Sequence, residues 1–202
     1  RLGPDRFYIV TGTGFATHDL DWVRRNIPAG LNAQVVDVTS GYGVLAVMGP
    51  NSRELLSRLS RDDLSNDGFP FGTVREIGIA GAPVLALRVT YVGELGWELH
   101  IPTEYAVNVY EALMEKGADL GIRPAGYRAI ESLRLEKGYR AWGSDIGPDH
   151  TPFEAGLGWA VKMKSNQAFL GREALADQSQ GSLKKLFAGF TVDPDIVLLG
   201  RE

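Results

Sequence analysis

The segment Tyr91-Val-Gly-Glu-Leu-Gly-Trp-Glu98 carries the residue types best suited to binding chemistry. Its two glycines, Gly93 and Gly96, allow the backbone to turn sharply and to approach another group closely. Trp97 and Glu98 are neighbours on the strand expected after the turn, so their side chains point to opposite faces. A carboxylate on a pocket face needs hydrogen-bond donors, which a ligand with two adjacent N–H groups would supply. Glu98 is therefore either a ligand-binding carboxylate or the ion-pair partner of a neighbouring arginine in a sharp hairpin.

A second group of charges lies on the helix predicted over residues 127–137 and ended by Gly138. Arg128, Glu131 and Arg134 are three residues apart, so they share one helix face. This spacing predicts surface ion pairs within the helix, each worth roughly 0.2–0.5 kcal/mol. The alternative is that one of these arginines reaches into a ligand cleft.

The turn Gly12-Thr-Gly14 lies between a predicted strand and a predicted helix, like the phosphate turn of a dinucleotide-binding βαβ unit. Thr17 stands where that motif has its third glycine. Asp19 and Asp21 fall in the first helical turns, where they would repel a pyrophosphate. A tight turn before an acidic helix start is therefore favoured, and a dinucleotide-binding enzyme remains the alternative.

The loop from Asp145 to Glu154 combines carboxylates, prolines and one histidine, His150. A histidine without a second, suitably spaced histidine is a weak zinc signal, and the Asp-Pro content is typical of turns. The loop is therefore predicted to be structural, and no metal site is expected. The other histidines, His18 and His100, have no recognisable partners in the sequence.

The composition excludes several classes of function. The 21 basic and 25 acidic residues are interleaved and sum to a formal charge of −4, so no basic stripe is offered to nucleic acid. The absence of cysteine excludes disulfides, thiolate catalysis and cysteine-ligated metals, and it fits a reducing compartment. No uncharged apolar run approaches the roughly 18 residues of a membrane span, so no membrane association is expected.

Hydrophobic periodicity predicts strands and helices in mixed order. Several strand pairs adjoin in sequence, which favours antiparallel pairing and an α+β fold over a doubly wound one. Thr103 is expected to cap the helix that follows it. Strands are predicted at 6–11, 34–38, 43–48, 74–79, 84–89 and 97–101, with a turn at Gly81-Ala82-Pro83, and helices at 17–27, 50–59, 104–116 and 127–137.

The C-terminal residues are expected to begin another domain. Residues 186–192 have the composition of a strand, a turn follows at Asp193-Pro194, and 196–199 form a second apolar run. A lone hairpin is marginally stable in water, so the residues beyond Gly181 are expected to be poorly packed. The predicted domains are therefore 1–180 and 181–202. Because the chain begins at Arg1 without a methionine or a signal-peptide pattern, it is interpreted as a piece of a longer protein.

Three segments in order resemble the aminomethyltransferase (glycine-cleavage T-protein) family. They are Tyr91-Val-Gly-Glu-Leu-Gly-Trp-Glu-Leu99, then Ala129-Ile-Glu-Ser-Leu-Arg-Leu-Glu-Lys-Gly138, then Gly143-Ser-Asp-Ile146 followed by Thr151-Pro-Phe-Glu-Ala-Gly-Leu-Gly-Trp159. The downstream Phe169-Leu-Gly-Arg-Glu-Ala-Leu175 matches as well, so the resemblance covers nearly the whole chain. The Glu-Lys-Gly-Tyr after the arginine helix is most similar to the C-terminal modules of sarcosine and dimethylglycine dehydrogenases.

The resemblance implies a folate site. In this family tetrahydrofolate lies in a cleft between ferredoxin-like subdomains, and a β-barrel domain follows, which residues 181–202 would begin. Tyr91 would face the folate, and Glu98 would hold the pterin through its ring N–H and amino groups. Phe71 and Val10 would also line the substrate pocket.

Two positions depart from the family pattern. Ile130 stands where the family has an arginine, so that role is either lost or taken by Arg128. Thr11-Gly12 replaces the asparagine expected after the first strand. The family's catalytic aspartate lies a few residues before the position of Arg1, so this chain is expected to supply the folate cradle without the base that manages protons at the attacking nitrogen.

The implied reaction is one-carbon transfer to tetrahydrofolate. An upstream flavin domain, the expected holder of FAD, would oxidise an N-methyl amine such as sarcosine or dimethylglycine, and tetrahydrofolate would capture the carbon as methylene-tetrahydrofolate. An aminomethyl carrier is the other donor in this family. The implied compartment is the bacterial cytoplasm or the mitochondrial matrix. A different class also fits the same resemblance, namely a folate-sensing regulatory module without transfer chemistry.

Overall fold

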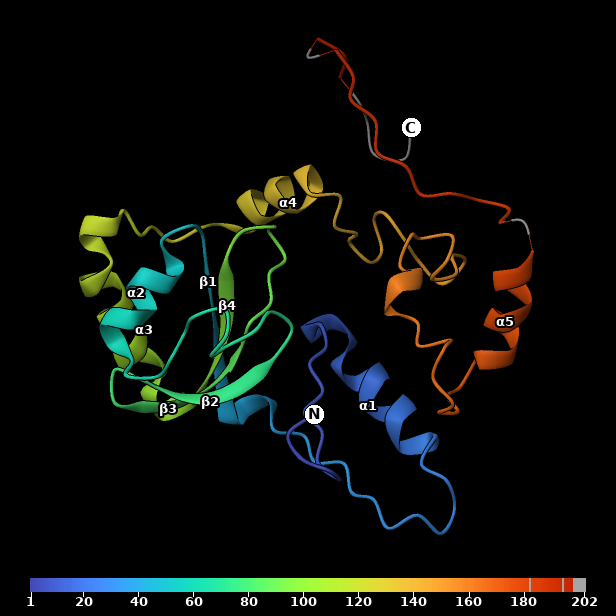
Figure 1. Cartoon of the computed structure of the whole chain (residues 1–202), viewed down its shortest axis with the longest axis horizontal. Helices are drawn as coiled ribbons and strands as arrows, with labels where there is room; N and C mark the ends of the chain where they lie inside the picture. Colours follow the sequence, from blue (N-terminus) through green and yellow to red (C-terminus); the bar gives the residue numbers. More distant parts are fainter. Residues whose placement is uncertain (182, 194, 198–202) are drawn as a thin grey trace. The chain divides into compact units, whose positions relative to one another are not determined.

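The computed structural model describes residues 1–181, 183–193 and 195–197, without the side chains of residues 179 and 180. The chain divides into two compact units, Arg1–Ile130 and Glu131–Glu202. Figure 1 shows the sheet with α2 and α3 in the first unit and α5 in the second. Helix α4 (Tyr127–Glu136) contains the boundary between the two units.

A four-stranded sheet forms the centre of the first unit. Its strands, in spatial order, are β1 (Tyr42–Met48), β4 (Gly96–Pro102), β3 (Ala82–Leu87) and β2 (Val74–Ile79), and each neighbouring pair is antiparallel. Helices mixed with an antiparallel sheet confirm the α+β prediction. From β1 to α3 the order is strand, helix, three strands and helix, which differs from the βαββαβ order of a ferredoxin-like subdomain.

The hairpin between β2 and β3 turns at Ala80 and Gly81. Both residues have positive φ, 49° and 82°, as a two-residue hairpin turn requires. The sequence predicted this hairpin but located its turn at Gly81-Ala82-Pro83. Ala82 and Pro83 instead begin β3, because Ala82 already pairs with Ile79 across the turn.

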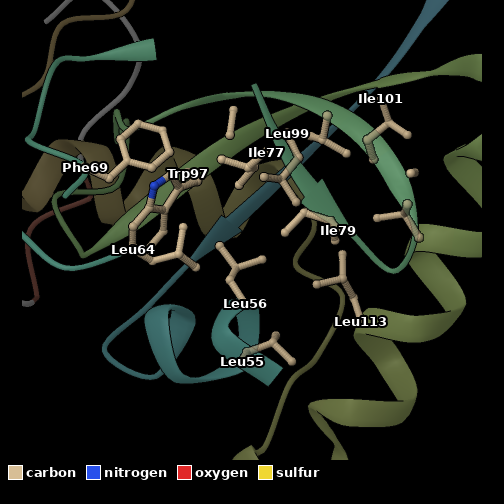
Figure 2. Close-up of a cluster of buried hydrophobic side chains, with 14 residues drawn as sticks. Leu55, Leu56, Leu64, Phe69, Ile77, Ile79, Trp97, Leu99, Ile101 and Leu113 are labelled. Atoms are coloured by element: carbon tan, nitrogen blue, oxygen red, sulfur yellow. The ribbon is translucent and has the colours of Figure 1, made fainter. Parts of the chain in front are cut away.

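Two helices cover one face of the sheet and enclose the apolar core. They are α2 (Ser52–Leu59) and α3 (Ala106–Lys116). Strand alternation points Trp97, Leu99 and Ile101 of β4 into this core, where all three are fully buried. Figure 2 shows them together with Phe69, whose ring lies edge-on to that of Trp97 at a centroid distance of 6.2 Å. Removal of this apolar surface from water is the dominant stabilising term for the unit.

Two predicted strands do not form. Residues 6–11 and 34–38 are irregular, although β-branched and aromatic residues are frequent in both. Their apolar side chains are largely exposed, including those of Phe7, Ile9 and Val36. No strand of the described residues pairs with either segment. A high β-propensity gives a strand only where a neighbouring strand supplies hydrogen bonds and packing.

The turn at Gly12–Gly14 therefore leads into a helix without following a strand. A 3-10 turn, η1 (Thr13–Phe15), continues into α1 (Ala16–Arg25), which is the helix predicted at 17–27. Asp19 lies in the first turn of α1 and accepts a hydrogen bond from Thr11. A dinucleotide-binding βαβ unit needs a strand on each side of the helix, so this turn lacks the scaffold of that motif.

The helix after β4 begins later than predicted. Thr103 opens a 3-10 turn, η3 (Thr103–Tyr105), and α3 follows from Ala106. The Thr103 hydroxyl donates to the Ser40 carbonyl at 2.8 Å. Thr103 thus fastens the end of β4 to the segment before β1, and the prediction that it caps the helix is wrong.

The helices of the described residues are short. The α-helices have between 8 and 11 residues. None of those described is long and apolar enough to cross a membrane. The remaining 3-10 turns are η2 (Thr39–Gly41), η4 (Ala118–Leu120) and η5 (Gly158–Ala160).

Arg134 organises the beginning of the second unit. Only 3% of this residue is exposed. It donates to the carboxylates of Glu131 and Asp145 and, at 2.9 Å, to the Tyr139 carbonyl. The predicted pairing of Glu131 with Arg134 is confirmed. Its expected location on the surface is wrong, because Asp145 and the Tyr139 backbone enclose the guanidinium.

Other polar side chains of the second unit hold irregular backbone in the same way. Arg140 donates to the Ala155 carbonyl at 2.9 Å. Arg172, the first residue of α5 (Arg172–Gln180), donates to the Met163 carbonyl at 2.7 Å. In the polar loop 145–154, the His150 side chain accepts from a backbone N–H at 3.1 Å, which agrees with the predicted turn chemistry.

The C-terminal segment does not form the predicted strand. Residues 183–193 are described and are irregular. Phe187 is attached to the unit, since its N–H donates to the Glu154 carbonyl at 2.9 Å and Arg140 lies over its ring at 4.8 Å. The second apolar run, 196–199, lies partly outside the described residues. The domain boundary at residue 180 stays a prediction.

Candidate functional site

The face of the sheet opposite the core carries Glu98 and His100. Both alternate with core residues along β4, so the two-residue period of a strand puts them on the same face. Glu98 lies in register between Ala46 of β1 and Leu87 of β3. Trp97 is fully buried, whereas the Glu98 side chain is 30% exposed. The prediction that these two neighbours point to opposite faces is confirmed.

Glu98 has a histidine beside it where one alternative prediction expected an arginine. His100 Nε2 is 3.8 Å from Glu98 Oε2, which is beyond hydrogen-bond distance. Among the residues described, no arginine forms an ion pair with Glu98, so the arginine-paired hairpin is not observed. Since the ionic contact of Glu98 within the described part of the chain is this long, its carboxylate can still accept hydrogen bonds there.

Tyr8 reaches the same cluster from the N-terminal segment. Its hydroxyl oxygen is 3.1 Å from His100 Nδ1, and its ring lies edge-on to the imidazole at 5.3 Å. The ring of Tyr42, at the start of β1, is 5.9 Å from that of Tyr8. Burial, followed by the neighbouring Tyr42, raises the pKa of the Tyr8 phenol above its ordinary value. The phenol is therefore protonated at neutral pH and available as a donor.

A shallow cavity of about 180 Å³ lies on the same side of the sheet. Leu87, the register partner of Glu98, lines it together with Tyr8. Glu98 does not line the cavity but is adjacent to it through Leu87. A partly apolar wall next to a carboxylate suits a ligand that has a flat apolar face and a donor edge. The full lining is Arg1, Leu2, Tyr8, Gly72, Thr73, Val74, Leu87 and Val89.

The predicted aromatic site residues, Phe71 and Tyr91, lie on segments that reach this cavity. Phe71 is exposed and directly precedes the lining residues Gly72 and Thr73. Tyr91 is partly exposed in the connection between β3 and β4, two residues after the lining residue Val89. Neither side chain lines the cavity, and their role as site residues stays a prediction.

The two glycines of the motif have different structural roles. Gly93 has φ 74° in the connection before β4, a conformation that favours glycine. At Gly96 an added Cβ would lie 2.8 Å from the Val47 carbonyl oxygen. The predicted close approach at Gly96 is thus between the backbones of β4 and β1. Glu98 lies on β4, and β1 is one of its two neighbouring strands.

Two predicted site residues are not connected to Glu98 by any contact. Val10 is exposed in the irregular N-terminal segment, two residues after Tyr8. Arg128 is exposed near the start of α4 and forms no ion pair among the described residues. The predicted pair between Arg128 and Glu131 is therefore not observed.

Sequence reasoning missed Tyr8 and His100. The statement that His100 lacks a partner is wrong, since it meets both Tyr8 and Glu98. Its position two residues after Glu98 on a predicted strand was a usable signal, because such residues share a face. Tyr8 is 92 residues from His100, and no local pattern connects them. His18 also has a partner, the adjacent Asp19 at 2.9 Å.

Comparisons with known proteins agree with this fold. Residues 1–165 match the GCVT N-terminal domain. Human sarcosine dehydrogenase is 42% identical over 199 residues, covering 98% of this chain and 22% of that protein. The aminomethyltransferase of Halothermothrix orenii is 41% identical over 192 residues, covering 94% of this chain and 52% of that protein.

One solved structure is also similar to this chain over most of its length. The crystal structure of the glycine cleavage system aminomethyltransferase T from Bartonella henselae has a TM-score of 0.68 and 29% identity, covering 83% of this chain and 44% of that one. The chain thus spans about a fifth to a half of the length of the curated relatives described above. With the match extending over most of its residues, the chain belongs to the aminomethyltransferase family defined by the GCVT N-terminal domain.

Proposed function

We propose that the sheet face around Glu98 binds tetrahydrofolate and that Glu98 is its main anchor. The observation that carries this proposal is a partly exposed carboxylate with unused acceptor capacity beside a cavity, on the sheet face opposite the core. Membership of the aminomethyltransferase family supports a reduced folate as the ligand.

The chemistry of the ligand fits these groups. A pterin presents a ring N–H and an amino group on one edge, and an ionised carboxylate accepts from both at once. Its flat face suits stacking on the aromatic side chains of Tyr91 and Phe71. Val10 and Arg128 complete the proposed contact set.

The wider proposal is that this chain is the folate-dependent one-carbon module of an N-methyl amine dehydrogenase-like enzyme. The names of the relatives support it, since they include a sarcosine dehydrogenase and an aminomethyltransferase. A flavin domain elsewhere in such a protein would oxidise the N-methyl amine. Tetrahydrofolate held at this site would then capture the carbon as methylene-tetrahydrofolate. Residues 181–202 would begin a further domain.

The test is replacement of Glu98 by glutamine. Hydrogen bonds to an ionised group contribute about 1.5–3 kcal/mol, and an amide accepts at only one of its two positions. Glu98→Gln is therefore expected to weaken tetrahydrofolate binding by roughly tenfold to a hundredfold. The measurement is an anaerobic calorimetric titration of the full protein.

The matched control is Glu111→Gln, which makes the same change at an exposed carboxylate of α3, on the side of the sheet where the core lies. It is expected to leave the affinity unchanged. Equal affinities for wild type and Glu98→Gln would contradict the role of Glu98.

A turnover assay separates transfer from sensing. The full protein, given sarcosine or dimethylglycine and tetrahydrofolate, is expected to form methylene-tetrahydrofolate. Saturable folate binding without this product would instead support the folate-sensing alternative.

A further inference from the structure

His100 is a buried imidazole with one nitrogen satisfied and the other free. It is 1% exposed. Nδ1 faces the Tyr8 hydroxyl at 3.1 Å, whereas Nε2 has no hydrogen-bond partner among the described residues. A buried polar atom without a partner is costly. Since the unpaired Nε2 is directed toward the Glu98 carboxylate 3.8 Å away, the structure leaves one donor position unused beside the proposed ligand anchor.

Tyr8 determines which nitrogen carries the proton. A neutral imidazole has one donor nitrogen and one acceptor nitrogen. The Tyr8 phenol can donate to Nδ1 at 3.1 Å, whereas the opposite tautomer would set the Nε2 lone pair against the Glu98 carboxylate. The proton of the imidazole is then on Nε2, the nitrogen that faces Glu98.

Among the described residues, no other acceptor side chain competes for Nε2–H. In register, His100 lies between Val44 of β1 and Leu85 of β3, which are both apolar. The other titratable groups on the strands of this face are Tyr42, next to Tyr8, and Glu76, which lies one strand beyond Leu85. Arg1, which lines the cavity on the same side, is a cation and cannot accept. The Glu98 carboxylate is thus the acceptor that Nε2–H can reach with a small side-chain movement.

We infer that His100 is a positioning residue: Tyr8 fixes its Nε2–H form, and this donor holds one oxygen of Glu98 so that the carboxylate meets the ligand in a single orientation. This inference rests on the proposed function of Glu98. An oriented anchor binds more tightly than a mobile one, because less side-chain freedom is lost when the ligand arrives. The hydrogen bond from Nε2 closes from its present 3.8 Å separation when the ligand fixes the carboxylate.

Two substitutions at one position test the geometry. Glutamine extends its amide nitrogen to about the place of Nε2, whereas asparagine reaches only the place of Nδ1. His100→Asn is expected to weaken tetrahydrofolate binding about tenfold, since a donor to an ionised group is lost. His100→Gln is expected to retain most of the wild-type affinity. His18→Asn, at an exposed histidine of α1, is the control and is expected to change nothing.

The tautomer is measured in the unsubstituted protein. With nitrogen-15 in its histidines, the full protein is expected to show His100 protonated at Nε2 and not at Nδ1. The Nε2–H proton is expected to shift downfield when anaerobic tetrahydrofolate is added. This readout does not depend on whether a variant folds, and thermal unfolding of each variant shows which affinities are comparable.

The possible failures are distinguishable. If wild type does not bind tetrahydrofolate, both the proposed function and this inference are overturned. If wild type binds but His100→Asn binds equally well, or if His100 carries its proton on Nδ1 in the complex, only the positioning role is overturned. Equal losses in His100→Asn and His100→Gln would also overturn it, because a donor at the Nε2 position would then have no effect.

Discussion

The two units of the chain are stabilised by different interactions. In the first unit, α2 and α3 and one face of the sheet enclose a continuous apolar core that includes Trp97 and Phe69. In the second, arginine side chains hold irregular backbone through carboxylates and carbonyls, with Arg134 the most buried of them. The stability that core packing gives involves many side chains at once and depends little on ionic strength. Each guanidinium contact, by contrast, can be removed without the others. Glu98 thus stands on the unit that contains the continuous apolar core.

The largest expected effect is that of Trp97→Ala in the first unit. The substitution empties the centre of the core and removes the ring that the guanidiniums of Arg53 and Arg88 cover at 5.9 and 5.5 Å. Truncation of a buried aromatic costs about 3–5 kcal/mol, so urea unfolding of the first unit should shift by that amount. The control is Trp159→Ala in the second unit, where the ring is 80% exposed. It is expected to change stability by less than about 0.5 kcal/mol, and similar losses from both would contradict the division into packed and polar units.

A smaller effect is expected from Arg134→Gln in the second unit. The hydrogen bond that Arg134 donates to Glu131 raises the pKa of the guanidinium against the lowering effect of burial. The group is therefore charged, and its replacement by glutamine leaves Glu131 and Asp145 without a cation. Hydrogen bonds to charged groups contribute about 1.5–3 kcal/mol, and the expected loss is of that size. Hydrogen exchange should increase around Tyr139 and Asp145 while β4 stays protected.

Lys164→Gln, at an exposed cation of the same unit, is the control for Arg134→Gln and is expected to leave exchange unchanged. Loss of protection in β4 on substitution of Arg134 would show that the first unit depends on this polar cluster after all.

The first unit is also the part that the sequence predicted best. Alternation located every boundary of β1, β2 and β4 to within one residue, because each strand has a buried face and a neighbouring strand. The same signal failed at 6–11 and 34–38, where no described strand accepts the hydrogen bonds. A local sequence pattern indicates only the propensity to form a strand. Whether a partner strand lies beside the segment depends on the tertiary fold.

The site and the second unit show the same limit. That Glu98 faces away from the core follows from its neighbour Trp97, and His100 could have been added from its spacing. The contact of Tyr8 with His100 could not, since 92 residues separate them. The burial of Arg134 could not be predicted either. Helix spacing predicts Glu131 as a partner, but the contact with Asp145 depends on the tertiary fold.

The smallest expected effect concerns Gly96, where β4, the strand that carries Glu98, packs closely against β1. A Cβ at Gly96 would lie 2.8 Å from the Val47 carbonyl oxygen and would also meet the Met48 side chain. The Met48 side chain can move aside, but the backbone of β1 must shift, so Gly96→Ala is expected to cost about 1–2 kcal/mol.

Gly78→Ala on β2 is the matched control, because nothing lies within 4 Å of its Cβ and the change removes unfolded-state freedom, which stabilises by about 0.4–1 kcal/mol. Thermal unfolding measures both variants, and tetrahydrofolate titration shows whether a shift of β1 against β4 reaches Glu98, two residues further on. Opposite signs for the two glycines are expected. Equal and small effects would show that the pairing of β1 with β4 is loose enough to absorb a methyl group, and that the scaffold of Glu98 is less rigid than its core suggests.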